Sequence, residues 1–151
     1  MAAFASRRVF LDANVFLYAA GVDSTVATAC RALLAAVRDG QLDATTSTEV
    51  VQEILHVVAR RRGATIAADA ADAVLALVPE PIAVTPTVIR STVAVVRASP
   101  TLSIRDAVHV AAMRSEGIGI VVSADKYFDA VDVERVDPYD SEAVQALLRR
   151  L

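Results

Sequence analysis

Hydrophobic residues along the chain form two patterns: short continuous runs and longer segments with helical spacing. The short runs hold Val, Ile, Leu or Phe between polar or turn residues, as is typical of buried β-strands. The clearest are residues 8–12 and 119–122. Weaker runs at residues 42–45, 82–84 and 133–136 predict three further short strands.

The longer segments place hydrophobic residues three and four positions apart, which predicts helices. Their expected spans are 14–20, 24–38, 46–62, 65–78, 86–98, 104–115 and 141–151. Ser24, Thr46 and Ser103 stand where N-caps belong, and Gly63 and Gly117 stand where helices end. Strands that alternate with helices in this way predict an α/β fold with a largely parallel sheet. No repeat or linker divides residues 1–151, so a single domain is expected.

Four acidic residues lie at the ends of predicted strands or in the first two turns of predicted helices. Asp12 and Asp125 come at the carboxyl ends of two predicted strands, whereas Glu53 and Asp106 lie early in two predicted helices. Because ligands of open α/β sheets bind at the carboxyl edge, all four acids are expected to meet there. A cluster of oxygen ligands suits hard ions such as Mg2+ and Mn2+.

Each acid also has a structural interpretation. Asp12 can cap a helix that begins near Asn14, although a second polar oxygen two residues later favours a site. Glu49 and Glu53 share a helix face; Glu49 is explained as the capping-box partner of Thr46, so Glu53 is the chosen site residue and Glu49 its substitute.

Asp106 has capping-box spacing from Ser103, yet the otherwise apolar helix around it favours a site. His109, one turn later, is interpreted as an interior histidine that could orient Asp106. Ser123, Asp125 and Asp129 can line a metal or water site, or supply turn chemistry instead; Asp129 is the weakest of them.

Composition narrows the classes of function. The 151 residues are 55% hydrophobic and 22% charged, with a net charge of −3, which is not the balance of a bulk nucleic-acid binder. An acidic nuclease pocket is compatible with it, because bound metal ions invert the local field. Cys30 is the only cysteine, so no internal disulfide is possible and a reducing, cytoplasmic setting is favoured. No apolar stretch of about 20 residues predicts a membrane span, and no secretory signal is recognised.

Four short motifs together resemble a known family. They are Leu11-Asp12-Ala13-Asn14, Glu49-Val-Val-Gln-Glu53, Asp106-Ala-Val-His-Val-Ala and Ser123-Ala-Asp125-Lys-Tyr-Phe-Asp129. In this order and spacing, over nearly the whole chain, they resemble the PIN-domain ribonucleases, and among these the VapC toxins of bacterial toxin–antitoxin pairs. The resemblance implies a three-layer α/β/α sandwich.

The resemblance also implies site roles and partners. Asp12, Glu53, Asp106 and Asp125 would hold Mg2+ or Mn2+ and carry catalysis, with Asn14 and Ser123 supporting them by hydrogen bonds. Asp129 matches a more variable family position. A metal-dependent endoribonuclease is implied, typically a homodimer, with RNA as substrate and an antitoxin whose C-terminal segment covers the acidic site.

Two other functions stay open on the sequence alone. One is a catalytically inactive PIN-like binding module, since a fold does not fix a function. The other is a haloacid-dehalogenase-like phosphohydrolase, which is disfavoured because Asn14 stands where its second acid is needed and Lys126 directly follows Asp125. The five glycines form no phosphate-binding or dinucleotide-binding loop.

Overall fold

A four-stranded parallel sheet forms the centre of the protein. The computed structural model describes residues 6–150. The strands are β1 (Ser6–Leu11), β2 (Ala44–Thr45), β3 (Ile118–Val122) and β4 (Glu134–Val136), in the order β2-β1-β3-β4. Every neighbouring pair is parallel, so all carboxyl ends lie at one edge.

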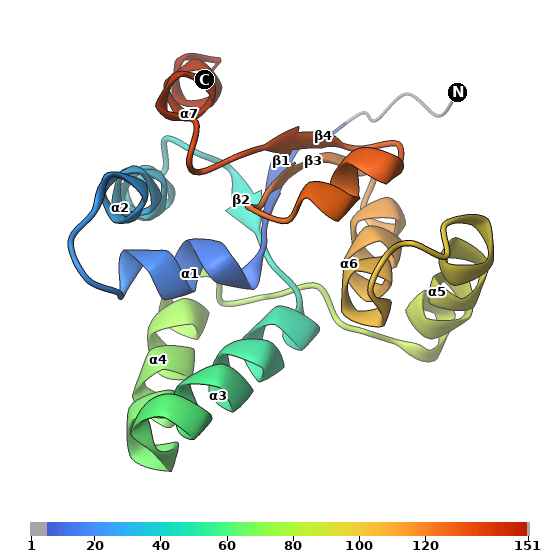
Figure 1. Ribbon diagram of the computed structural model, residues 1–151, viewed down its shortest axis with the longest axis horizontal. Coiled ribbons are helices and arrows are strands. Elements are labelled where there is room, and N and C mark those ends of the chain that lie inside the picture. Colours follow the sequence, from blue (N-terminus) through green and yellow to red (C-terminus); the bar gives the residue numbers. More distant parts are fainter. Residues whose placement is uncertain (1–5, 151) are drawn as a thin grey trace.

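Helices cover both faces of this sheet. They are α1 (Ala13–Ala19), α2 (Thr25–Arg38), α3 (Thr48–Arg62), α4 (Ala64–Leu77), α5 (Pro86–Ala98), α6 (Ile104–Ser115) and α7 (Ser141–Arg149). Figure 1 shows α5 and α6 on one side of the sheet and α1, α2 and α7 on the other. The predicted three-layer α/β/α fold is confirmed. Helices α3 and α4 pack together beyond the carboxyl edge (Figure 1).

The central strands are buried on both faces, which explains their unbroken hydrophobic runs. Val9, Phe10 and Leu11 of β1 are fully buried, as are Val121 and Val122 of β3. Polar residues therefore begin where each strand ends, and the carboxyl edge becomes the polar side of the core.

Local capping chemistry sets most helix boundaries. At the starts of α2, α3 and α6, the side-chain oxygens of Ser24, Ser47 and Ser103 each accept a hydrogen bond from the backbone N–H three residues later. Helix α3 ends at Gly63, whose φ of 91° lies in the region that favours glycine. Most predicted helices therefore match the observed ones within one or two residues.

Several sequence predictions were wrong in detail. Thr46 does not cap α3; Ser47 does, while the Thr46 hydroxyl donates to the carbonyl oxygen of Leu11. Residues 82–84 form no strand, because only Ile82 makes an isolated bridge, to Ser47. A short 3-10 helix, η1 (Lys126–Ala130), was not predicted. The expected final residue of α7, Leu151, lies outside the described residues.

The core gathers residues from every layer. Cys30 of α2 is fully buried, as predicted, and burial raises the pKa of its thiol to about 11.

Within residues 6–150, no helix is both long and apolar enough to cross a membrane.

Candidate metal and active site

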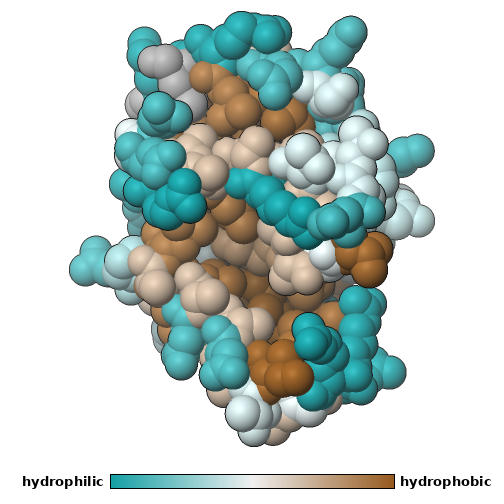
Figure 2. All heavy atoms as spheres, turned by 90° about the vertical axis from the view of Figure 1, so that its left-hand side faces the viewer, coloured by the Kyte–Doolittle hydropathy of each residue, from teal (hydrophilic) through white to brown (hydrophobic). Residues whose placement is uncertain are grey.

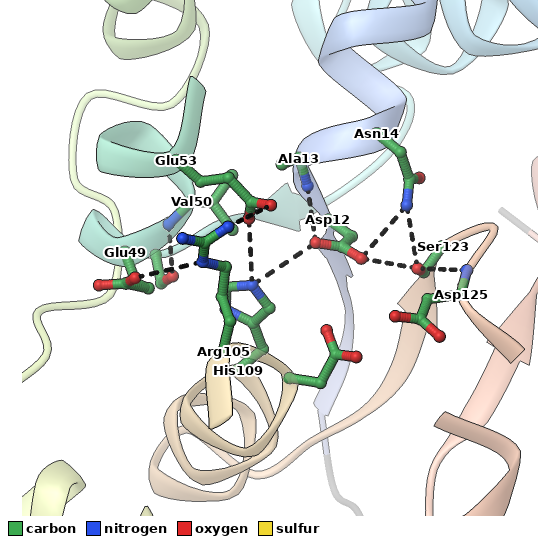
Figure 3. Close-up of polar contacts among 12 residues, drawn as sticks. Asp12, Ala13, Asn14, Glu49, Val50, Glu53, Arg105, His109, Ser123 and Asp125 are labelled. Atoms are coloured by element: carbon green, nitrogen blue, oxygen red, sulfur yellow. Dashed lines mark hydrogen bonds and ion pairs between the residues drawn. The ribbon is translucent and has the colours of Figure 1, made fainter. Parts of the chain in front are cut away.

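The carboxyl edge of the sheet brings distant segments into contact. The backbone N–H of Asp12, just after β1, donates to the carbonyl of Val122 at 3.1 Å, and that of Ser123, just after β3, donates to the carbonyl of Val136 at 3.1 Å. Side chains from α3 and α6 approach the same edge (Figure 3). Residues more than a hundred positions apart thus share one polar cluster.

Asp12 lies at the centre of the cluster and is buried. Its Oδ1 accepts from the backbone N–H of Ala13 at 2.8 Å, and its Oδ2 accepts from the Ser123 hydroxyl at 2.6 Å. Asp12 is therefore both the N-cap of α1 and a member of the polar cluster. The capping interpretation and the site interpretation of this residue are compatible with each other. Burial raises its pKa, against the opposing effects of His109 and Ser123.

Asn14 and Ser123 both form hydrogen bonds with the Asp12 carboxylate. The Asn14 amide Nδ2 lies 3.3 Å from Asp12 Oδ2 and 3.2 Å from Ser123 Oγ. Ser123 Oγ also accepts from the backbone N–H of Asp125 at 3.0 Å (Figure 3). These bonds hold the Asp12 carboxylate in one orientation and connect the ends of β1 and β3.

Glu53 projects from the second turn of α3 toward Asp12. Its Oε1 lies 3.1 Å from Arg105 Nη1, and its Oε2 lies 3.7 Å from His109 Nε2. Burial raises the pKa of Glu53, but His109 and Arg105 outweigh burial, so the net pKa is lowered. This carboxylate is therefore ionised at neutral pH.

Glu49 is close to Glu53 but is not a capping-box partner. Since Ser47 is the cap, Glu49 is the second helical residue, not the third, and the capping-box explanation was wrong. Its Oε1 lies 3.7 Å from Arg105 Nε, so Arg105 spans both glutamates. The Arg105 side chain is 46% exposed, and no pattern in the sequence predicts that it joins the cluster.

Asp106 is a buried acid in the first turn of α6. Its backbone N–H donates to Ser103 Oγ at 3.0 Å, which confirms Ser103 as the cap of α6. Its Oδ2 is buried without a hydrogen-bond partner, an arrangement that costs roughly 1–3 kcal/mol. Burial, with the nearby carboxylates of Asp125 and Asp12, raises the pKa of Asp106 to about 7.

His109 is completely buried one turn after Asp106. Its Nε2 lies 3.5 Å from Asp12 Oδ1 and 3.7 Å from Glu53 Oε2, beyond good hydrogen-bonding distance, and both ring nitrogens lack hydrogen-bond partners. The sequence suggested that this ring could orient Asp106. In the structure the ring instead faces Asp12 and Glu53 (Figure 3). The spacing of Asp106 and His109 along α6 does place them on a common face.

The two remaining predicted residues differ in position. Asp125 caps η1 by accepting from the backbone N–H of Tyr127 at 3.0 Å, and it lines the same pocket as Asp106. Asp129 instead pairs with Arg135 at 2.9 Å on the surface. Of the seven predicted site residues, the structure brings six together and leaves Asp129 apart.

An open pocket of about 500 Å³ lies beside this cluster. Its charged lining consists of Glu49, Glu53, Asp106, Asp125 and Arg105. The ligand atoms of Asp12, Glu53 and His109 lie within 4.8 Å of one another, which is compatible with a shared metal ion. A carboxylate-rich wall next to an open pocket can hold divalent cations and accept an anionic substrate through them.

A second hollow, also about 500 Å³, lies among α1, α2, α3 and α4. Its lining is mostly apolar and includes Phe16, Leu34, Ile54, Val58 and Leu77. Figure 2 shows hydrophobic surface exposed over this side of the molecule, with hydrophilic side chains around it. We call it the apolar groove; helix α3 lies between it and the acidic pocket.

Comparison with known proteins agrees with this architecture. The PIN domain family matches residues 9–134, and the chain therefore belongs to that family. Within the family its sequence groups it with the VapC proteins: it is 36% identical over 145 residues to Ribonuclease VapC7 of Mycobacterium tuberculosis, covering 93% of this chain and 97% of that protein.

Two solved structures share the fold. The first, VapBC2 from Rickettsia felis bound to a DNA fragment from their promoter, has a TM-score of 0.64 and 13% identity over 85% of this chain and 96% of that one. The second, FitAcB from Neisseria gonorrhoeae, has a TM-score of 0.70 and 17% identity over 87% of this chain and 99% of that one. The predicted resemblance is confirmed.

Proposed function

We propose that this protein is a metal-dependent endoribonuclease that hydrolyses RNA phosphodiester bonds with a metal-activated water. The observation that carries the proposal is the convergence of Asp12, Glu53, Asp106 and Asp125 beside an open pocket at the carboxyl edge. The similarity to Ribonuclease VapC7 supports the same activity.

In the proposed site, the four carboxylates hold Mg2+ or Mn2+. When bound, the ion supplies an activated water and stabilises charge on the phosphate and the leaving oxygen. The donor set fits such an ion, because Asp106 Oδ2 is buried and unpartnered and a cation would relieve the repulsion among neighbouring carboxylates.

The protein's own residues have distinct parts in this scheme. Ser123 and Asn14 fix the Asp12 carboxylate, so that its orientation does not depend on substrate. Arg105 at the pocket mouth balances the charge of Glu49 and Glu53 and is exposed enough to approach a phosphate. We assign no part in the reaction to Asp129, which pairs with Arg135 on the surface.

The test is RNA cleavage by purified protein, free of any partner, with Mg2+ or Mn2+ and an EDTA control. Asp106→Asn keeps the shape of the side chain and removes its charge; Asp129→Asn is the matched control on the surface. We expect discrete cleavage by wild type and by Asp129→Asn, and none by Asp106→Asn or with EDTA. Full activity of a folded Asp106→Asn protein would exclude this assignment.

Absence of both RNA cleavage and metal binding in wild type would instead favour an inactive binding module. Phosphate release from small phosphomonoesters, after a burst of the alcohol leaving group, would favour a phosphohydrolase with a carboxylate nucleophile. The same set of assays therefore separates the three functions.

We further propose that the protein acts as the toxin of a toxin–antitoxin pair in the cytoplasm, and that it forms a homodimer. An antitoxin segment carrying Arg or Lys would complement the acidic pocket. The apolar groove supports a protein partner, because it is lined by Ile54, the residue after Glu53 on α3, and by Val58, five residues after Glu53. With a candidate antitoxin, Val58→Asp should weaken binding, and Glu49→Gln should weaken it less. Light scattering tests the dimer.

A further inference from the structure

His109 is an unusual residue to find at the base of an acidic site. Its side chain has no exposed surface, and neither ring nitrogen has a hydrogen-bond partner. Buried polar groups are nearly always satisfied, so an orphaned imidazole indicates a missing partner. Figure 3 shows the ring directed between the Asp12 and Glu53 carboxylates. The partner therefore belongs in the space that these three side chains share.

The distances fit a common ion better than they fit hydrogen bonds. Nε2 lies 3.5 Å from Asp12 Oδ1 and 3.7 Å from Glu53 Oε2. Two ligands about 2.1 Å from one ion are about 3.0 Å apart at right angles, about 3.4 Å apart at a tetrahedral angle and at most about 4.2 Å apart. Both distances fall within this range, whereas they are too long for a good N–H···O bond.

The other oxygen of each carboxylate is already engaged. Asp12 Oδ2 accepts from Ser123 Oγ, and Glu53 Oε1 pairs with Arg105. The oxygens that remain turned toward Nε2 are Asp12 Oδ1, which accepts a hydrogen bond from the Ala13 N–H, and Glu53 Oε2. The packing of the His109 ring against Phe10, with centroids 5.5 Å apart, limits how it can turn away.

We propose that His109 Nε2 is a metal ligand and that, with Asp12 and Glu53, it forms a mixed nitrogen and oxygen site. This inference rests on the metal dependence in the proposed function and assigns a residue outside the four carboxylates. Imidazole nitrogen favours transition ions over Mg2+. The inner part of the cluster therefore selects later transition ions such as Co2+ over Mg2+, while Asp106 and Asp125 provide oxygen ligands alone.

The composition of the chain makes this directly measurable. It has two histidines, His109 and His56; His56 is exposed on α3 and is not among the residues that line the acidic pocket. Pulsed EPR of bound Mn2+ detects a nitrogen ligand through its nuclear modulation. Recording wild type with natural and with nitrogen-15-labelled histidine assigns that modulation to imidazole without any mutation.

Two variants then locate the ligand. His109→Phe keeps an aromatic ring against Phe10 but removes the nitrogen, and His56→Phe is the matched control. We expect the histidine modulation to vanish only in His109→Phe. The preference for Co2+ over Mg2+, measured by competition calorimetry, should fall at least tenfold in that variant, since even outer-shell changes cost roughly 10- to 100-fold in affinity.

The outcomes separate this inference from the proposed function. Mn2+ bound by wild type without histidine modulation would overturn the inference and leave a metal-dependent nuclease with oxygen ligands alone. Modulation that persists in His109→Phe would overturn it as well. Failure of wild type to bind Mn2+, Co2+ or Mg2+ would overturn both the inference and the metal dependence of the proposed function.

Discussion

Replacing Asp106 with Asn should stabilise the metal-free protein, and increasingly so as the pH rises. The ordinary Asp pKa of 3.8 applies to the unfolded chain, whereas in the folded protein burial and the Asp125 and Asp12 carboxylates raise the pKa to about 7. Between these values the folded state binds more protons than the unfolded state. The free energy of unfolding therefore falls as pH rises from about 4 to about 7, and this loss is complete above pH 8.

The size of the effect follows from the same two pKa values. A difference of about three pH units corresponds to about 4 kcal/mol as an upper limit, at about 1.36 kcal/mol for each unit. Because neighbouring carboxylates share the proton and can relax, we expect roughly 2–4 kcal/mol. Asn keeps the shape and carries no charge, so its advantage over Asp should grow by that amount between pH 4 and pH 8.

The assay is urea denaturation in EDTA, followed by circular dichroism, at a series of pH values. Asp129→Asn is the control: the Arg135 guanidinium lowers the pKa of Asp129, so its pH dependence should have the opposite sign and a small size. A constant difference between Asp106→Asn and wild type from pH 4 to pH 8 would refute the reasoning. Saturating Mg2+ should reduce the difference at pH 8, because a bound cation compensates the Asp106 charge.

Three further predictions concern the core and the cluster. Ser123→Ala should lower the free energy of unfolding by about 1–3 kcal/mol in urea denaturation, because Asp12 loses its 2.6 Å bond; an unchanged midpoint would contradict this. Leu33→Ala should cost about 2–5 kcal/mol by the same measurement, since Leu33 is fully buried, and a smaller loss would mean that the core relaxes around the cavity. Cys30, buried with a pKa of about 11, should resist thiol reagents at pH 8 until the protein unfolds; rapid labelling of native protein would show local opening of α2.

Much of the fold follows from the sequence because its strongest signals are local. The apolar run of β1 and the caps Ser24 and Ser103 act within a few residues; the bounds of α2 and α6 were predicted within one residue and those of β1 within two. The prediction of a strand at residues 82–84 was wrong, because an apolar run does not reveal whether another strand is available to pair with it. Thr46 and Ser47 were confused because both are good caps, and the choice depends on the distant carbonyl of Leu11, which Thr46 contacts.

The acids could be predicted in the same way, since strand ends and early helix positions of a parallel sheet share one edge. What the sequence could not give is the set of contacts that crosses that edge. Arg105 meets Glu53 across 52 positions, and the orientation of His109 depends on how α6 lies against β1 and α3. Such contacts depend on helix rotation, which residue spacing does not determine.

The Ser123–Asp12 hydrogen bond spans 111 positions of the chain, and this separation has a consequence for synthesis. A growing chain carries Asp12 long before it carries Ser123, so it lacks the hydroxyl that fixes Asp12, and the end of β3, until residues 123–125 have been made. Since domains fold as units and long-range contacts form late, the complete carboxylate cluster exists only after that part of the chain has been synthesised. A chain stopped before that point would carry most of the acids yet lack the geometry that makes them a site.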